Sequence, residues 1–305
     1  MGSISPEVLN ETSWALDRLD WMRKRNIWPH GKRYLWTDAF GLLLLISLHH
    51  ETGEPGFLDE AERLVDEVDR VLGRERGIRI GEAPDRDGQY FHYLAMWIYA
   101  LTRFGEVRNE YRERAIRLVR EIHSAFVIPG RGVIWKMEED LSAPYPGYGL
   151  GALDPFHGYV VYRLLDPEGL APEIDEMRKL VESNYRHLRI DQDLGLGMML
   201  WMTHFFPDEE WAIAQREISL EMLEELWIDP PGYFCRARGM KHMKFTFTNA
   251  GVSIGLQSAG SGIDRVRKLH RFFDSYESGD EYDIDPITHV MLCCSHMPGE
   301  LIQAE

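Results

Sequence analysis

The sequence contains little of what marks several protein classes. Basic residues are scarce, because 34 Lys and Arg stand against 50 Asp and Glu, which gives a net charge of -16. Nucleic acids and anionic membranes are recognised through basic patches, so neither is expected as a partner. No apolar run is long enough to cross a membrane, and residues 1–7 lack the basic and then apolar segment of a secretion signal. We therefore expect a soluble, cytoplasmic protein.

Cysteine is also rare. The chain has three cysteines, too few for a disulfide framework, and their spacing does not fit a zinc site. Cys293 and Cys294 are adjacent in an apolar segment and are expected in the core. Cys235 lies beside Arg236 and Arg238, whose charges favour a thiolate, so a reactive role for it is left open.

The signature motifs of cofactor and metal enzymes are absent as well. The sequence has no GxGxxG, P-loop, HExxH, GxSxG or EF-hand pattern in the context that each requires. This argues against nucleotide, zinc-protease and serine-hydrolase chemistry, and we expect neither a cofactor nor a metal.

What the sequence does contain is a repeated pattern of two kinds of segment. Charged amphipathic segments cover roughly residues 6–25, 57–75, 107–127, 171–189, 208–227 and 263–277. Between them lie nearly uncharged segments rich in Gly, Met and aromatic residues, at roughly 36–51, 87–105, 153–166, 193–206, 246–260 and 285–298. A helix with one apolar stripe lies at a surface, whereas a helix that is apolar all round is buried. The pattern predicts an all-α toroid of six inner and six outer helices, formed by one domain over residues 1–305.

The connecting segments differ in length according to their direction. Those leading from a charged to an apolar segment are often long, as at residues 26–35, 75–86, 128–152 and 228–245. Long loops gathered at one rim are typical of a binding surface. The inner helices also begin at this rim, where their unpaired N–H groups and positive dipole ends converge. We therefore expect a small-molecule site at the loop rim.

Five of the apolar segments begin at or near an aspartate: Asp38, Asp87, Asp154, Asp193 and Asp285. Asp is a preferred N-cap residue, and a proline directly after Asp154 and Asp285 strengthens the capping interpretation of these two. A cap at the rim of a closed ring also faces the cavity, so a structural and a functional role are compatible.

An imidazole follows the aspartate by about one turn in three of these segments, at His92, His157 and His289. A carboxylate can fix the tautomer of a nearby imidazole, and the pair can transfer protons near neutral pH. Three satisfied helix caps would produce the same spacing, so both interpretations stay open.

Two segments concentrate polar and aromatic groups in front of an apolar segment. Trp36 stands next to Asp38, which places an aromatic platform for a sugar ring beside a carboxylate. Residues 85–92 combine two acids, an arginine, an amide, the phenol of Tyr90 and the imidazole of His92. The helical spacing points His92 toward the cavity, while a hydrogen-bonded core histidine is the alternative.

The longest loop carries Trp135, Lys136 and Glu138 in a run that ends in three acids. It is either a lid that brings a carboxylate to the substrate or a solvated charge run. The Tyr- and Gly-rich residues 144–149 favour a shaped binding wall. Arg79, in the loop before residue 85, either binds an anionic group or belongs to a short hairpin.

Twelve alternating helices with long loops on one rim resemble the six-hairpin, (α/α)6-barrel glycosidase-like superfamily. Trp36-Thr37-Asp38 is similar to the W-x-D segment that carries the general acid/base in unsaturated glycuronyl and rhamnogalacturonyl hydrolases. The segments WTDAF, DRDGQYFHY, WKM and DP-x-x-G look like those of a bacterial group of toroids to which no activity is assigned. The same barrel hosts sugar epimerases with paired histidines and linalool dehydratase-isomerase-type enzymes with Asp, Tyr, His and Cys, and fold alone does not choose among these.

The leading hypothesis is a carbohydrate-active enzyme, a glycoside hydrolase in which two carboxyl groups act on opposite sides of a bound saccharide. Asp38 with either Asp87 or Asp154 would supply them. The full set of expected catalytic residues is Asp38, Asp87, His92, Asp154 and His157. The expected substrate-binding residues are Trp36, Arg79, Tyr90, Trp135, Lys136 and Glu138.

One alternative is an isomerase, epimerase or dehydratase in which His92 and His157 move protons. Its apolar pocket would be lined by Met96, Met198, Met199 and Trp201, which the competing interpretation assigns to the plain core. A second alternative is a non-catalytic toroid that binds a ligand in its cavity.

Overall fold

Twelve α-helices make up most of the regular structure in the computed structural model, which describes residues 6–227 and 246–302. The charged helices are α1 (Pro6–Lys24), α3 (Gly56–Leu72), α5 (Glu110–Phe126), α7 (Ala171–Asn184), α9 (Glu210–Leu226) and α11 (Ile263–Phe273). The apolar helices are α2 (Leu35–Thr52), α4 (Phe91–Val107), α6 (Asp154–Leu165), α8 (Asp193–Thr203), α10 (Thr246–Ser258) and α12 (Pro286–His296). The predicted alternation of helices is confirmed, and Cys235 lies outside the described residues.

Burial separates the two kinds of helix as the sequence pattern predicts. Helix α4 is buried on every side, without interruption from Leu94 to Gly105. Helix α5 buries one stripe, which includes Tyr111, Ala115, Leu118 and Ile122 at the spacing of an amphipathic helix. Cys293 and Cys294 are buried free thiols, as expected of core residues.

The chain divides into two compact units. Unit 1 contains residues 1–31, 47–57 and 189–305, and unit 2 contains residues 32–46 and 58–188. The organisation as one domain over residues 1–305 stays a prediction.

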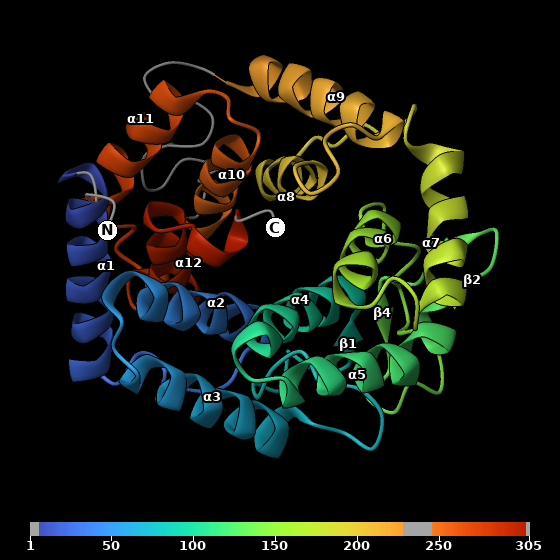
Figure 1. The fold of residues 1–305 in the computed structure, drawn as a ribbon, viewed down its shortest axis with the longest axis horizontal. Helices are drawn as coiled ribbons and strands as arrows, with labels where there is room; N and C mark the ends of the chain where they lie inside the picture. The colour runs from blue at the N-terminus through green and yellow to red at the C-terminus, as the bar shows by residue number, and fades with distance from the viewer. Residues whose placement is uncertain (1–5, 228–245, 303–305) are drawn as a thin grey trace. The chain divides into compact units, whose positions relative to one another are not determined.

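In unit 2, α4 packs against α5 and α6, and α6 packs against α7 (Figure 1). Two short antiparallel ribbons join the loops of this unit. Strand β1 (Gln89–Tyr90) pairs with β4 (Lys136–Met137), and β2 (Val127–Ile128) pairs with β3 (Gly132–Val133). The β1–β4 pairing holds side by side two loops that lie far apart in the sequence.

In unit 1, α10 packs against α8, α11 and α12, while α8 also contacts α9, and α1 packs against α12. The residues that the dehydratase hypothesis assigned to an apolar pocket are buried in the two units: Met96, Met198, Met199 and Trp201. The indole N–H of Trp201 donates to the Leu301 carbonyl at 2.7 Å. These contacts agree with the core interpretation.

Helices α8 and α10 approach so closely that only glycine fits between them. A methyl group on Gly197 would lie 2.2 Å from the Gly251 carbonyl oxygen, and one on Gly255 would lie 2.3 Å from the Gly197 carbonyl oxygen. The obstacle is backbone, which cannot turn away as a side chain can. The glycines of these two segments therefore set the distance between the helices.

We expect Gly197→Ala to lower the free energy of unfolding by about 1–3 kcal/mol or more, because the added methyl group overpacks a backbone contact. Chemical denaturation measures this change. Gly56→Ala is the matched control, since a methyl group there would meet nothing within 4 Å. Equal stability of the two variants would contradict the close approach.

Candidate functional site

The β1–β4 ribbon brings together two segments that the sequence separates by more than forty residues. Tyr90 lies directly opposite Lys136 in the pairing register, and the Phe91 N–H donates to the Trp135 carbonyl at 3.2 Å. Helix α4 begins at Phe91, so His92 stands in its first turn next to the ribbon. The residues that the sequence analysis selected in these two loops are therefore neighbours.

Gln89 locks the ribbon in place, a role that the sequence did not reveal. Its side chain is fully buried. The amide donates to the carbonyls of Arg76 at 2.9 Å and Glu139 at 2.7 Å, and its oxygen accepts from the Ile78 N–H at 2.9 Å. One amide thus satisfies three backbone groups in two loops, and its contact with Glu139 joins residues 50 positions apart in the sequence.

Aromatic rings surround His92. The Tyr90 ring stacks on Trp135 at 5.7 Å and on His92 at 5.6 Å between ring centroids, with interplanar angles of 16° in both pairs. We call this group the aromatic wall: Trp36, Tyr90, Tyr93, Trp135 and Tyr148. Trp36 is 2% exposed, whereas Trp135 is 40% exposed. Of these two expected platforms, only Trp135 presents substantial ring area to a ligand.

Beneath the wall, His92 meets Asp154, the first residue of α6. The Nδ1 atom of His92 lies 3.7 Å from the Asp154 Oδ1, and the Trp135 indole N–H donates to the same Nδ1 at 3.3 Å. An indole can only donate, so Nδ1 accepts in the neutral imidazole and the proton lies on Nε2. A protonated imidazole would instead direct Nδ1–H toward the carboxylate. The group can therefore change partner as it gains or loses a proton.

The sequence left open whether each acid pairs with the imidazole of its own helix or caps that helix. The ion pair joins Asp154 of α6 to His92 of the neighbouring α4. In α12, the His289 Nδ1 accepts from Arg18 and its Nε2 donates to the Asp283 carbonyl, while Asp285 caps the helix by accepting from the Ile287 N–H. Helix spacing had suggested partners along the chain, and packing between helices supplied them instead.

His157 is fully enclosed in the same region. Burial, and then the charge of His92, lowers the pKa of His157 to about 3. The ring is therefore neutral at physiological pH.

The Asp87 carboxylate is fixed by hydrogen bonds from neighbouring side chains. It does not cap α4, because that helix begins four residues later. It accepts from the Tyr145 hydroxyl at 2.7 Å and from the Lys136 amine at 3.1 Å. The Tyr145 hydroxyl, together with Lys136, keeps the pKa of Asp87 below its usual range. The Lys136 amine also lies 3.6 Å from the centre of the Tyr145 ring. Lys136 is thus engaged by protein groups.

Asp38 forms a buried ion pair at the start of α2. Its Oδ1 lies 3.2 Å from the Arg33 guanidinium, and its Oδ2 accepts from the Tyr34 N–H at 3.3 Å. Both side chains are about 2% exposed or less. Its expected catalytic role stays a prediction. In the structure Asp38 supplies the counter-charge of the buried Arg33.

The remaining expected binding residues lie in the loops around the ribbon. Arg79 pairs with Glu139 at 2.9 Å, and Glu139 also pairs with Arg74 at 2.9 Å. Glu138 is half-buried after β4, and its N–H donates to the Ala143 carbonyl at 2.9 Å. The segment after Trp135 is consequently folded onto the protein as strand and turn and is no solvated charge run.

The other two aspartates of the series lie in unit 1. Asp193 is the first residue of α8 and accepts from the Thr248 hydroxyl at 2.8 Å. Asp285 is the N-cap of α12. The expected capping role of Asp154 was wrong, because Leu153 occupies the N-cap position and no side-chain cap hydrogen bond forms there. Asp154 is therefore available for another task.

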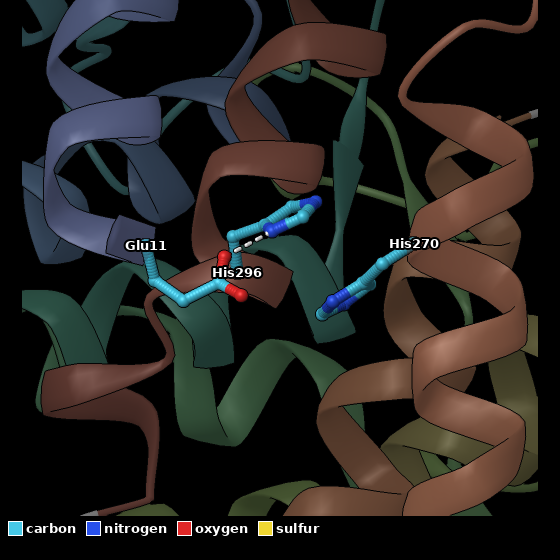
Figure 2. A group of neighbouring side chains, drawn as sticks. All are labelled: Glu11, His270 and His296. Atoms are coloured by element: carbon cyan, nitrogen blue, oxygen red, sulfur yellow. Dashed lines mark hydrogen bonds and ion pairs between the residues drawn. The ribbon is translucent and has the colours of Figure 1, made fainter. Parts of the chain in front are cut away.

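One group in unit 1 has the residue types of a metal site. The ligand atoms of Glu11, His270 and His296 lie within 4.8 Å of one another, and Figure 2 shows Glu11 and His270 on either side of His296. The His270 and His296 rings are stacked, 3.9 Å apart and inclined by 24°, so their in-plane lone pairs do not converge. His296 donates to Glu11 at 2.5 Å and to Asp274 at 2.8 Å. This arrangement is that of an imidazolium held by two carboxylates.

Solved structures with the same fold belong to carbohydrate enzymes. An inactive variant of an alpha-1,6-mannanase from a Salegentibacter species, in complex with alpha-1,6-mannotriose, has a TM-score of 0.65 at 11% identity, covering 94% of this chain and 99% of that one. The cellobiose 2-epimerase of Spirochaeta thermophila has a TM-score of 0.64 at 15% identity, covering 89% and 87%. A D-mannose isomerase has a TM-score of 0.62 at 12% identity, covering 89% and 88%. The chain thus has the all-α (α/α)6-barrel fold, as predicted.

No protein-family model matches the sequence, and no curated protein sequence matches it. Among the described residues, no helix is both long and apolar enough to span a bilayer. The cytoplasmic location stays a prediction.

The two carboxylates around His296 make a prediction about pH. Burial opposes its charge, but the hydrogen bonds to Asp274 and Glu11 prevail and raise the pKa of His296 above 6.5. A raised pKa stabilises the fold below the unfolded value, and this contribution is lost as the pH rises through the folded pKa. His296→Gln should therefore lower Tm more at pH 6 than at pH 9.

Thermal unfolding across this pH range measures the difference between the variant and the wild type. Asp274→Asn removes one of the two carboxylates and should reproduce part of the effect. A Tm difference for His296→Gln that grows with pH would contradict the assignment.

Proposed function

We propose that this protein is a carbohydrate-active enzyme whose reacting groups lie in unit 2 around Asp154 and His92. The observation that carries the proposal is the setting of the His92 imidazole: the Tyr90 ring stacks on it, the Trp135 indole N–H donates to its Nδ1, and the buried Asp154 carboxylate lies beside it. Aromatic faces next to acid–base groups suit a sugar ring, which offers C–H faces and hydroxyl edges. The (α/α)6-barrel enzymes of similar fold, which include a mannanase, an epimerase and an isomerase, support the same substrate class.

Glycoside hydrolysis is the leading reaction, and it needs two carboxyl groups in different environments. Asp154 is 4% exposed, and its Oδ1 accepts no hydrogen bond from the described residues, as suits a carboxyl that gives a proton to the leaving oxygen. Asp87 is about one-third exposed and is held ionised by Tyr145 and Lys136. It would activate water or stabilise positive charge on the sugar.

The pair would differ in sequence from that of the mannanase. The inactive variant of that enzyme carries asparagine in place of two consecutive aspartates. No two aspartates are adjacent in the present sequence. The carboxylates proposed for this protein come from two segments, the loop before α4 and the start of α6.

Sugar isomerisation or epimerisation is a second candidate, favoured by the position of His92. Its Nδ1 can exchange the Trp135 indole for Asp154 when it takes up a proton, which is the behaviour of a general base. The neutral His157 nearby is a second imidazole of the kind that proton transfer at carbon requires. In this reaction His92 would remove a proton from the carbon next to a sugar carbonyl.

We expect Asp154→Asn to lower kcat by about 10²–10⁴-fold, because a positioned proton donor is lost. Tm should change little, since Asp154 caps no helix. Asp38→Asn is the contrasting variant: it removes the counter-charge of buried Arg33 and should cost about 3–5 kcal/mol of stability. Release of reducing sugar from a panel of glycosides and thermal unfolding measure the two effects. Full activity of Asp154→Asn would refute the assignment.

The two reactions are separated by solvent exchange. Under the second candidate, the wild-type protein should incorporate deuterium from D2O at the carbon next to the carbonyl of an aldose, and His92→Ala should abolish this. Mass spectrometry of the recovered sugar measures the incorporation. If the protein hydrolyses glycosides but incorporates no deuterium, the isomerase or epimerase candidate is excluded and glycoside hydrolysis remains.

A further inference from the structure

A cavity of about 340 Å³ lies within unit 1, in the region where α1 faces the first turns of α12. None of its lining residues belongs to the aromatic wall or to the acid–base groups of unit 2. The α1 side contributes Arg18, Trp21 and Arg25, and α12 contributes Thr288 and His289. Its volume is at the lower end of the range typical of small-molecule sites.

Two guanidinium groups are held on indole faces at this cavity. The Arg18 guanidinium carbon lies 5.1 Å from the centre of the Trp14 ring and 5.5 Å from that of Trp21, and the Arg25 guanidinium carbon lies 4.8 Å from that of Trp21. Neither arginine forms an ion pair with a carboxylate of the described residues. The indoles restrict both side chains and leave their N–H donors available to a ligand.

Three acids also line the cavity, and none of them forms an ion pair with these arginines in the described part of the chain. Asp274 accepts from His296 at 2.8 Å. The Asp283 carboxylate accepts from the N–H and hydroxyl of Ser278, at 2.6 and 2.7 Å. Glu277 is exposed at the edge. Each of these acids thus has another hydrogen-bond partner or lies in solvent, and the two guanidinium groups keep donors that can reach a ligand.

A buried hydroxyl completes the donor set. Thr288 is 7% exposed, and its Oγ1 has no hydrogen-bond partner among the described residues. A buried hydroxyl without a partner is costly, and a bound ligand would remove that cost. Beside it, the His289 Nδ1 lies 3.5 Å from the Arg18 guanidinium, and its Nε2 donates to the Asp283 carbonyl at 2.9 Å. His289 therefore acts as a neutral support for Arg18.

We propose that this cavity binds an anionic saccharide, with the carboxylate or phosphate on Arg18 and Arg25. The hydroxyl of Thr288 would bond to the ligand at the inner end of the cavity. The saccharide part rests on the proposed function, whereas the preference for an anion rests on the arginines alone. The site is distinct in its residues from the acid–base groups of unit 2.

Isothermal titration calorimetry on the Asp154→Asn protein tests binding without turnover. The probes are glucuronate, glucose 6-phosphate, uncharged glucose and inorganic phosphate. We expect at least one of the two anionic sugars to bind with a Kd at least tenfold lower than that of glucose, and their comparison tells a carboxylate site from a phosphate site. Calorimetry measures binding directly. A wrong assignment of the catalytic residues would therefore not abolish the binding expected at this cavity.

Arg25→Gln should raise the Kd of the anionic sugar about tenfold, while Lys24→Gln should leave it unchanged. These neighbouring residues carry the same charge, and only Arg25 lines the cavity. Thr288→Val, which keeps the shape of the side chain, should also weaken binding several-fold. Unchanged affinity in both Arg25→Gln and Thr288→Val would overturn the proposal. Binding of inorganic phosphate as tightly as glucose 6-phosphate, or of glucose as tightly as both anionic sugars, would overturn it as well.

Discussion

The candidate site depends on one small contact, the antiparallel pairing of Gln89–Tyr90 with Lys136–Met137. This ribbon places the Trp135 ring on Tyr90, the Lys136 amine on Asp87 and the Trp135 indole N–H on His92. Two pairs of residues form too little backbone structure to be stable alone. The buried Gln89 amide supplies the missing anchorage by bonding to loop carbonyls on both sides. The geometry of the candidate site is therefore set by a buried polar side chain of the ribbon itself.

Charge pairing divides the acids near this ribbon into two classes. Asp38 and Asp87 each face a cation, Arg33 and Lys136 respectively, and both cations are buried. Burying such cations without counter-charges would be costly, so the two carboxylates contribute to stability as well as to any reaction. Asp154 pairs with no lysine or arginine among residues 6–227 and 246–302, and its ion-pair partner there is the His92 imidazole. An acid with no structural role is the one best suited to change its protonation state during a reaction.

Hydrophobic periodicity predicted the helices well because it reflects a property of each segment by itself. Helix α6, for example, was expected near residues 153–166 and spans Asp154–Leu165. The same reasoning did not choose between the two interpretations of the acid–imidazole spacing. It considered only neighbours along one helix, whereas Asp154 found His92 on the adjacent helix. Trp36 and Trp135 also looked equivalent as sugar platforms, but packing buried the first and exposed the second.

By itself, the sequence determined the alternation of buried and amphipathic helices, the core positions of Cys293 and Cys294, and the two segments that carry the candidate site. These follow from local periodicity and composition, which act before any distant contact forms. Tertiary structure alone decided which acid has a cation as partner, which tryptophan is exposed, and how Arg18, Arg25 and Thr288 come to line one cavity. These features depend on contacts between residues far apart in the chain. The sequence separation of such residues follows no helical period, so periodicity does not reveal which of them meet.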